Sequence, residues 1–269
     1  MPKRNRKVTH EKILRRIEEG YGQGSGKAYR PWNTIHNKIT GGLSTREMNA
    51  VTDRVHHMLM RLEWYFFQYI NWNQNVVDIQ EHFALLPTSE TQKIASDVLM
   101  KHPTVSDKQG QRHPEVLTTT FLVTFCTDGG THKVAYDVYY SETLNHMIHQ
   151  IRTAIAYIYW KNRHIPYETV TDEQISQSFA MNVDFVQRYT DISSRVSLTV
   201  DDIASIAQAL TQRALVKEDK LMHIARKCDT QFGLNPGASI TVAYHLIANH
   251  YWIIDMNVRR IYDSIIELQ

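Results

Sequence analysis

The stretch that decides the fold comprises residues 116–140, which read VLTTTFLVTFCTDGGTHKVAYDVYY. Its two arms, Val116–Phe125 and Lys133–Tyr140, are rich in β-branched and aromatic residues, which favour strands. Between the arms, Asp128-Gly129-Gly130 is a strong signal for a hairpin turn. The stretch therefore predicts two antiparallel strands joined by a tight turn.

Further elements are expected on both sides of this hairpin. Val76–Leu86 starts with an apolar run and is closed by Pro87, which predicts another strand. Thr45–Tyr69 should contain a helix that carries Glu63, because apolar residues recur with helical spacing from His57 onward. The other expectations are a helix at Thr9–Glu19, a helix at Thr91–Met100, a loop at His102–Pro114 and a long helix at Glu142–Arg163.

The sequence changes character after Pro166, where helices dominate. Thr199–Asp202 resembles a capping box that opens a helix. A helix over Ala238–Asn249 and a short strand over Trp252–Met256 complete a helix, turn, helix, strand order that resembles a winged helix. A helix carrying Glu63, then a strand, then a strand pair resembles the layout of a metal-dependent, restriction-endonuclease-like DNA-cleaving domain, which places an acid on the first strand of the pair and a lysine on the second. The prediction is therefore an α/β chain with a restriction-endonuclease-like domain at residues 1–168 and a mostly helical, winged-helix-like domain at residues 169–269.

Composition is ordinary for a soluble globular protein, with 269 residues, 42% hydrophobic and 22% charged. The two cysteines and the absence of a signal-peptide pattern favour a reducing cytoplasm. No apolar run is long enough to span a bilayer, so no membrane partner is expected. A net charge of +2 says little by itself about nucleic acid.

Basic residues are concentrated near the N-terminus, a pattern that suits the phosphate backbone of DNA but also fits a solvated, frayed end. His56 and His57 are further candidates for DNA contact, with the surface of a helix as the simpler explanation. The candidate DNA-binding residues are Lys3, Arg4, Arg6, Lys7, Arg15, Arg16, Lys27, His56 and His57.

Two glutamates are candidate metal ligands. Glu63 lies one helix before the strands, and hydrolysis of a phosphodiester requires carboxylates that hold a divalent metal. Glu81 follows the apolar start of a strand, where a buried acid needs an ion or a partner. A solvated helix face is the alternative for Glu63, and a salt bridge to an arginine is the alternative for Glu81.

Three residues of the hairpin complete the candidate site. Asp137 and Tyr139 should share one face, since the side-chain period of a strand is two. The hydroxyl of Thr120 is a poor replacement for a carboxylate around Mg²⁺. The Tyr139 phenol carries no positive charge at neutral pH, so it cannot stabilise developing negative charge as an ammonium group does.

Several segments, taken in order, resemble the TnsA family, the endonuclease subunits of bacterial heteromeric transposases. The resemblance covers nearly the whole chain, and no single motif decides it. The segments are Ile17–Lys27 (IEEGYGQGSGK), Pro31-Trp32, Arg54–His57 (RVHH), Leu62-Glu63, Asp78–Phe83 (DIQEHF), Leu85–Pro87, Lys101–Pro103, Thr119–Val123 and Tyr159–Pro166.

The resemblance implies a nuclease that cuts the non-transferred strand at transposon ends with Mg²⁺. Its implied partners are transposon-end DNA, an integrase-type transposase and an AAA+ ATPase regulator. The family's catalytic glutamate corresponds to Glu63, its aspartate to Thr120, its glutamine to Asp137 and its lysine to Tyr139. Two essential positions are therefore substituted.

Three hypotheses follow. In the first, the nuclease centre is degenerate and the chain serves assembly and DNA binding, with no metal needed. In the second, a rearranged site built on Glu63 and Asp137, with Glu81 as a further metal ligand, still cuts the 5′ strand with Mg²⁺. In the third, the chain is a winged-helix regulator that reads DNA with Ser239–Asn249, although this helix contains no Arg or Lys.

Overall fold

The computed structural model describes residues 9–37, 42–107, 109–217 and 219–268. The candidate DNA-binding residues Lys3, Arg4, Arg6 and Lys7 lie outside these ranges. The chain divides into two compact units, Met1–Ile175 (the N-terminal unit) and Ser176–Gln269 (the C-terminal unit). The boundary predicted between residues 168 and 169 falls inside a strand, β8 (Tyr167–Thr171), which pairs with the sheet of the N-terminal unit.

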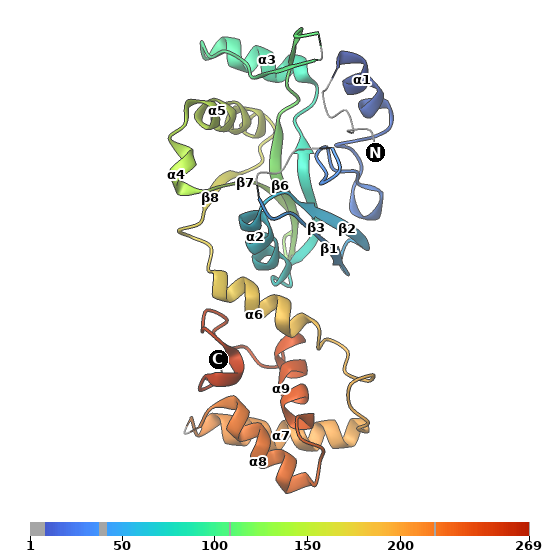
Figure 1. Ribbon diagram of the computed structural model, residues 1–269, viewed down its shortest axis with the longest axis vertical. Coiled ribbons are helices and arrows are strands. Elements are labelled where there is room, and N and C mark those ends of the chain that lie inside the picture. The colour runs from blue at the N-terminus through green and yellow to red at the C-terminus, as the bar shows by residue number, and fades with distance from the viewer. Residues whose placement is uncertain (1–8, 38–41, 108, 218, 269) are drawn as a thin grey trace. The chain divides into compact units, whose positions relative to one another are not determined.

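The N-terminal unit is built around a mixed four-stranded sheet in the order β3-β6-β7-β8 (Figure 1). Strand β3 (Val76–Ala84) is antiparallel to β6 (Thr118–Thr127), and β6 forms the expected hairpin with β7 (Gly130–Tyr139). These three strands confirm the sequence prediction. Strand β8 was not predicted; it lies parallel to β7 after the long α5 crossover.

A helix covers each face of this sheet. Helix α2 (Arg61–Asn71) packs Phe66 and Phe67 against one face of β3 and β6. Helix α5 (Met147–Lys161) packs Tyr159 and Trp160 against the other face. Alternate residues of β6 and β7 therefore face different helices, which places Thr120 and Asp137 on the α5 side with Leu122 and Ala135.

The helix expected within Thr45–Tyr69 is shorter than its pattern suggested. It begins only at Arg61, and before it β1 (Thr45–Asn49) and β2 (Arg54–Met58) form an antiparallel hairpin. In β2, buried residues alternate with more exposed ones, as expected for a strand. Two of the buried residues, Arg54 and His56, are polar, so the strand does not show the alternation of apolar and polar residues by which a strand is recognised in a sequence. His56 therefore lies on a strand, not on the face of the Glu63 helix.

The remaining elements of this unit follow the prediction with two exceptions. The expected loop at His102–Pro114 contains a short hairpin of β4 and β5, and the long helix at Glu142–Arg163 is broken at Asn145-His146. The other bounds are α1 His10–Glu18, the 3-10 turn η1 Gly26–Ala28, α3 Thr88–Asp97, β4 Thr104–Ser106, β5 Arg112–Pro114 and α4 Ser141–Leu144.

The C-terminal unit is helical, and the predicted winged helix is not confirmed. Its elements are α6 Gln177–Gln187, α7 Val200–Leu215, α8 Leu221–Phe232, α9 Ala238–Ala248 and the 3-10 turn η2 Ile261–Asp263. The Thr199 capping box is present. No strand forms at Trp252–Met256, where Trp252 is instead buried, so within the described ranges this part of the unit has no wing.

The proposed recognition helix is the buried centre of the C-terminal unit. Nine of the eleven residues of α9 are buried, and α9 packs against α6, α7 and α8. A helix that reads a groove must present a face to DNA. The third hypothesis, which assigned base recognition to this helix, is therefore wrong in its placement of the reading surface. Across the described ranges, no helix is long and apolar enough to cross a membrane.

Candidate functional site

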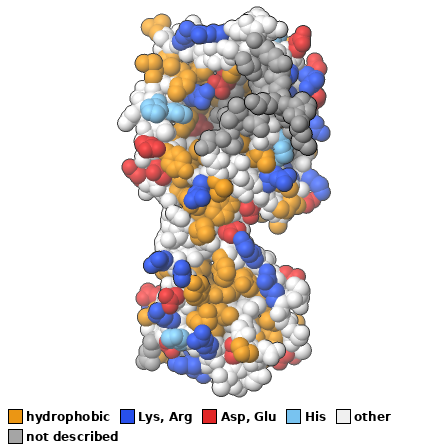
Figure 2. All heavy atoms as spheres, viewed as in Figure 1, with side chains coloured by type: hydrophobic (Ala, Val, Ile, Leu, Met, Phe, Trp, Pro, Cys, Tyr) orange, Lys and Arg blue, Asp and Glu red, His pale blue; other side chains and the backbone are white. Residues whose placement is uncertain are grey.

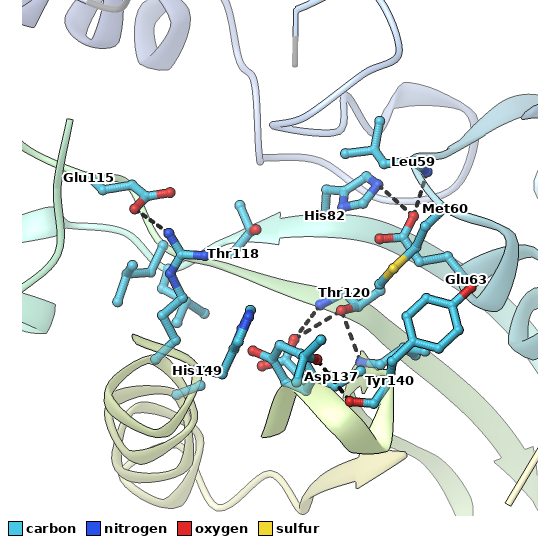
Figure 3. Close-up of a pocket in the computed structure, with 17 residues that line it drawn as sticks. Leu59, Met60, Glu63, His82, Glu115, Thr118, Thr120, Asp137, Tyr140 and His149 are labelled. Atoms are coloured by element: carbon cyan, nitrogen blue, oxygen red, sulfur yellow. Dashed lines mark hydrogen bonds and ion pairs between the residues drawn. The ribbon is translucent and has the colours of Figure 1, made fainter. Parts of the chain in front are cut away.

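A pocket of ≈ 280 Å³ in the N-terminal unit brings the four predicted catalytic positions together. Glu63, Thr120, Asp137 and Tyr139 all line it, although they come from α2, β6 and β7 (Figure 3). The pocket lies where the sheet meets the N-terminal end of α2 and the first turns of α5. The other polar residues that line it are His82, Glu115, Thr118, Tyr140, Thr143, His149 and Arg152.

Glu63 is positioned by the start of its own helix. It is the third residue of α2, and its Oε2 accepts a hydrogen bond of 2.5 Å from the backbone N–H of Leu59. A glutamate at this position commonly folds back to satisfy an N–H group before the helix. The side chain is 5% exposed. A structural role therefore explains the presence of Glu63 in the pocket as well as a catalytic role does.

His82 enters the pocket through an irregularity in β3. It has a left-handed backbone, with φ of +48°, and the β3–β6 ladder pairs Glu81 with Phe121 and Phe83 with Thr119 but omits His82. Its Nε2 lies 3.0 Å from the carbonyl oxygen of His57 and 3.6 Å from Glu63 Oε2. A non-glycine residue in this conformation needs support from its surroundings, and such residues often mark functional sites.

Thr120 and Asp137, which line the pocket, form a hydrogen-bond network with Tyr167. Asp137 Oδ1 accepts from the backbone N–H of Thr120 at 2.7 Å and from its hydroxyl at 3.1 Å. Asp137 Oδ2 accepts from the hydroxyl of Tyr167 at 2.8 Å. Burial raises the pKa of Asp137, and the donors from Tyr167 and Thr120 offset only part of this effect. Both oxygens of the one carboxylate on β7 in the pocket are therefore already engaged.

Tyr139 is an apolar and aromatic part of the pocket wall. Its ring packs edge-on against the ring of His149, with centroids 4.9 Å apart. Burial and the nearby Asp137 raise the pKa of the Tyr139 phenol, so the group stays neutral. The cation of the pocket comes instead from Arg152, whose guanidinium donates to Glu115 Oε2 at 2.6 Å.

Glu81 faces away from this pocket, so it is not a ligand for an ion held by Glu63. It is fully buried and makes a two-pronged ion pair with Arg54, with N–O distances of 2.9 and 2.6 Å, and a 2.8 Å contact with His56 Nδ1. Burial alone would raise the pKa of Glu81, but His56 and Arg54 together lower it to about 2. The arginine salt bridge, the alternative to a metal role, is what the structure contains.

Most of the described candidates for DNA contact have other partners. Arg16 lies between the rings of Tyr21 and Trp32, and burial lowers its pKa, so it is a packing residue. His56 is fully buried beside Glu81. Arg15 and Lys27 are exposed but form surface ion pairs with Glu19 and Asp53. Of the described candidates, His57 alone has a side chain without a hydrogen bond or ion pair in the described ranges.

Some residues of this region were not assigned to the site from the sequence: His82, Glu115 and Arg152, which line the pocket, and Tyr167, which hydrogen-bonds to Asp137. Tyr167 belongs to the missed strand β8, and Arg152 is on a helix whose register relative to the sheet was unknown. Glu115, which directly follows the loop predicted at His102–Pro114, lines the pocket, whereas Asp107 within that loop pairs with His113. His82 carries no local signal for its left-handed backbone.

Comparison with known proteins agrees with this architecture. A family model for the TnsA-like endonuclease N terminus matches residues 73–172, and one for the TnsA endonuclease C terminus matches residues 174–256. The Transposon Tn7 transposition protein TnsA of Escherichia coli is 31% identical over 252 residues, which is 93% of this chain and 88% of that protein.

The chain belongs to the TnsA family.

Within this family, the pocket does not fit a Mg²⁺ centre of the kind that the resemblance implies. Mg²⁺ prefers charged oxygen ligands and water in octahedral geometry. Thr120 offers no charge, both Asp137 oxygens accept hydrogen bonds, and Glu115 is paired with Arg152. Among the described residues of this TnsA relative, no group of three or more His, Cys, Asp or Glu side chains is placed to hold a metal ion.

Proposed function

We propose that this chain is a TnsA-family transposition subunit whose own nuclease centre is degenerate. It acts at transposon ends with an integrase-type transposase and an AAA+ ATPase regulator, in the bacterial cytoplasm, as an assembly and DNA-binding subunit. The observation that carries the proposal is the Thr120–Asp137–Tyr167 network, which uses both Asp137 oxygens. A metal ion here would have to compete with these three donors for the Asp137 carboxylate.

The chemistry that remains in the pocket supports the same conclusion. Cleavage of a phosphodiester needs a group that activates water and positive charge that stabilises the transition state. The position of the expected lysine holds Tyr139, a neutral phenol with a raised pKa. Arg152 is positively charged, but it is neutralised by Glu115. The N-terminal unit keeps the order of a restriction-endonuclease-like domain, which we propose as its fold, without that domain's full set of reactive groups.

The C-terminal unit suits protein docking better than DNA binding. Residues 176–269 carry slightly more Asp and Glu than Lys and Arg. Figure 2 shows basic and acidic side chains interspersed around apolar ones on the visible face of this unit. Binding to DNA depends on clustered positive charge. We therefore assign the ATPase contact to this unit and DNA contact to the N-terminal unit.

Strand-specific cleavage of a labelled transposon-end duplex tests the proposal. The reaction contains this protein, its transposase, its ATPase partner and Mg²⁺, beside a Glu63→Gln control. Glutamine keeps an oxygen that can accept from Leu59 N–H, so the start of α2 is preserved and only the charge is lost. The expected result is cleavage of the transferred strand alone, equal in the wild type and in Glu63→Gln.

The rival is an active nuclease with a rearranged site, favoured by the fact that Glu63 and Asp137 line one pocket. It predicts nicks on the 5′ strand that require Mg²⁺ and disappear in Glu63→Gln. That result would refute the degenerate centre and would indicate movement by excision on both strands.

A further inference from the structure

The outer face of the β1–β2 hairpin gathers basic side chains from three segments. Arg46 on β1 and His57 on β2 are directly opposite each other in the ladder and therefore point to the same face. The ring of His36, from the preceding loop, packs edge-on against the ring of His57 with centroids 5.9 Å apart. Arg46 and His36 are exposed, and His57 is half-buried.

Arg46 and His57 have no ion pair in the described ranges, unlike Arg54, Arg152 and Arg163 of the same unit. In the described ranges, the Arg46 side chain forms no hydrogen bond or ion pair, and no hydrogen bond engages the His57 ring. The charged neighbours of His57 are Arg46, His36, His82 and the single acid Glu81. Glu81 is already bound by Arg54 and His56, so it cannot neutralise the outer face.

Burial and this basic surrounding lower the pKa of His57. The lowered pKa leaves the His57 imidazole neutral at neutral pH, so Arg46 supplies positive charge at this face and His57 can contribute a hydrogen bond. On a DNA-acting protein, a cluster of Arg and His on an exposed strand pair is suited to a backbone phosphate. Arginine in particular binds phosphate oxygens with two parallel hydrogen bonds.

The cluster is connected to the pocket by the chain that follows β2. The His57 carbonyl accepts from His82 Nε2, and His82 lines the pocket. Leu59 and Met60, two and three residues after His57, also line it (Figure 3). A strand of DNA held at the cluster would therefore run past the mouth of the pocket.

We propose that Arg46, His57 and His36 form a binding site for a phosphodiester of the DNA backbone. The proposal rests on the proposed function, because it assumes that the chain acts on DNA. It adds the residues that hold the duplex, and it assigns this role to the hairpin instead of the α1 arginine Arg16 or the helix α9. Since phosphate contacts carry no sequence information, the contribution should be the same for any duplex.

The test is fluorescence anisotropy with the full-length protein and a labelled duplex of arbitrary sequence, over a series of salt concentrations. Arg46→Ala should weaken binding about threefold to tenfold and should reduce the slope of log K against log salt by about 1. Arg46→Lys should recover most of the loss, since a lysine still supplies a point charge. Arg112→Ala, an exposed arginine on β5 without a described ion pair, is the matched control and should bind as the wild type does.

Equal affinities for Arg46→Ala and Arg112→Ala would overturn the proposal. Unchanged binding to DNA together with weaker binding to the purified transposase would also overturn it and would make the hairpin a protein-docking face. Thermal unfolding midpoints that match the wild type confirm that the variants are folded. Duplex binding and strand cleavage are separate readouts, so this site and the degenerate centre can fail independently.

Discussion

Two buried carboxylates in the N-terminal unit, Glu81 and Asp137, have different kinds of partner and opposite pKa shifts. Glu81 on β3 is paired with Arg54 and His56, and its pKa falls to about 2 despite complete burial. Asp137 on β7 is held by two hydroxyls and one backbone N–H, and burial raises its pKa. Cationic partners keep a buried carboxylate charged, whereas neutral donors satisfy its geometry without recovering its solvation.

This difference separates a structural ion pair from the pocket that we propose to be a degenerate nuclease centre. Glu81 joins the β1–β2 hairpin to the sheet, since Arg54, His56 and the His57 backbone N–H all bind it. Asp137 lies in the pocket with Glu63, and it accepts hydrogen bonds from Thr120 and Tyr167. The predictions below test whether charge matters at the first site and is dispensable at the second.

The largest expected effect is at Glu81. Glu81→Gln removes the carboxylate that pairs with Arg54 and contacts His56, and a buried cation left without its partner costs about 3–5 kcal/mol. Urea unfolding followed by circular dichroism should show this loss of unfolding free energy. Glu168→Gln, an exposed acid on β8, is the control and should change stability by less than about 0.5 kcal/mol. A loss of that smaller size at Glu81 would mean that the buried ion pair contributes no net stability.

The pH dependence of stability should follow the same carboxylate. Because the folded-state pKa of Glu81 is about 2, below its ordinary value of 4.5, its stabilisation is present above about pH 4.5 and is lost as the pH falls toward 2. The loss amounts to at most about 3 kcal/mol. Asp137 acts in the opposite sense, since its raised pKa removes stabilisation as the pH rises. Thermal melts from pH 6 to about 2.5 should show a flatter profile for Glu81→Gln; a profile parallel to the wild type would exclude Glu81 as the source.

The sequence predicts the frame of the N-terminal unit well, because the hairpin of β6 and β7 combines strong strand propensity with a clear turn. It fails at β2, where buried polar residues replace the apolar half of the alternation. The Arg54–Glu81 pair depends on contacts between residues far apart in the chain, and local patterns contain no information on such pairing. The same reason explains the missed strand β8, which is stabilised by its parallel partner β7.

The sequence identified which catalytic positions line the candidate site, but it did not reveal the hydrogen-bond partners or backbone conformations of the residues there. The resemblance located Glu63, Thr120, Asp137 and Tyr139, and one pocket contains all four. The state of Asp137 depends on Tyr167, which reaches it from β8. The orientation of His82 depends on its left-handed backbone, and no pattern in the sequence indicates it because the position is not occupied by glycine or asparagine, the residues that most often adopt this conformation.

Restoring an acid at Thr120 should recreate a metal site. Thr120→Asp places a second carboxylate beside Asp137, whose raised pKa shows that negative charge is already costly there. Without metal, the free energy of unfolding of the variant should be about 1–3 kcal/mol lower than that of the wild type. Mg²⁺ at about 100 times its dissociation constant should raise that free energy again by up to about 2.7 kcal/mol. Differential scanning fluorimetry with Mg²⁺ against a salt of matched ionic strength measures both. Thr124→Asp, on the same strand but outside the pocket, should show no response; a Mg²⁺ response of the wild type would favour the rearranged nuclease.

The smallest effect is expected at Asp137 itself. In Asp137→Asn, the Oδ1 atom can still accept from the N–H and hydroxyl of Thr120, and the new amide can donate to the Tyr167 oxygen if that hydroxyl turns. Removing a poorly solvated charge offsets the weaker hydrogen bonds, so the loss should stay below about 1 kcal/mol. Urea unfolding beside Glu81→Gln gives the direct comparison. If the two variants lost equal stability, Asp137 would have to be held by a cation, either Arg152 or a bound metal, and the neutral network would not describe the pocket.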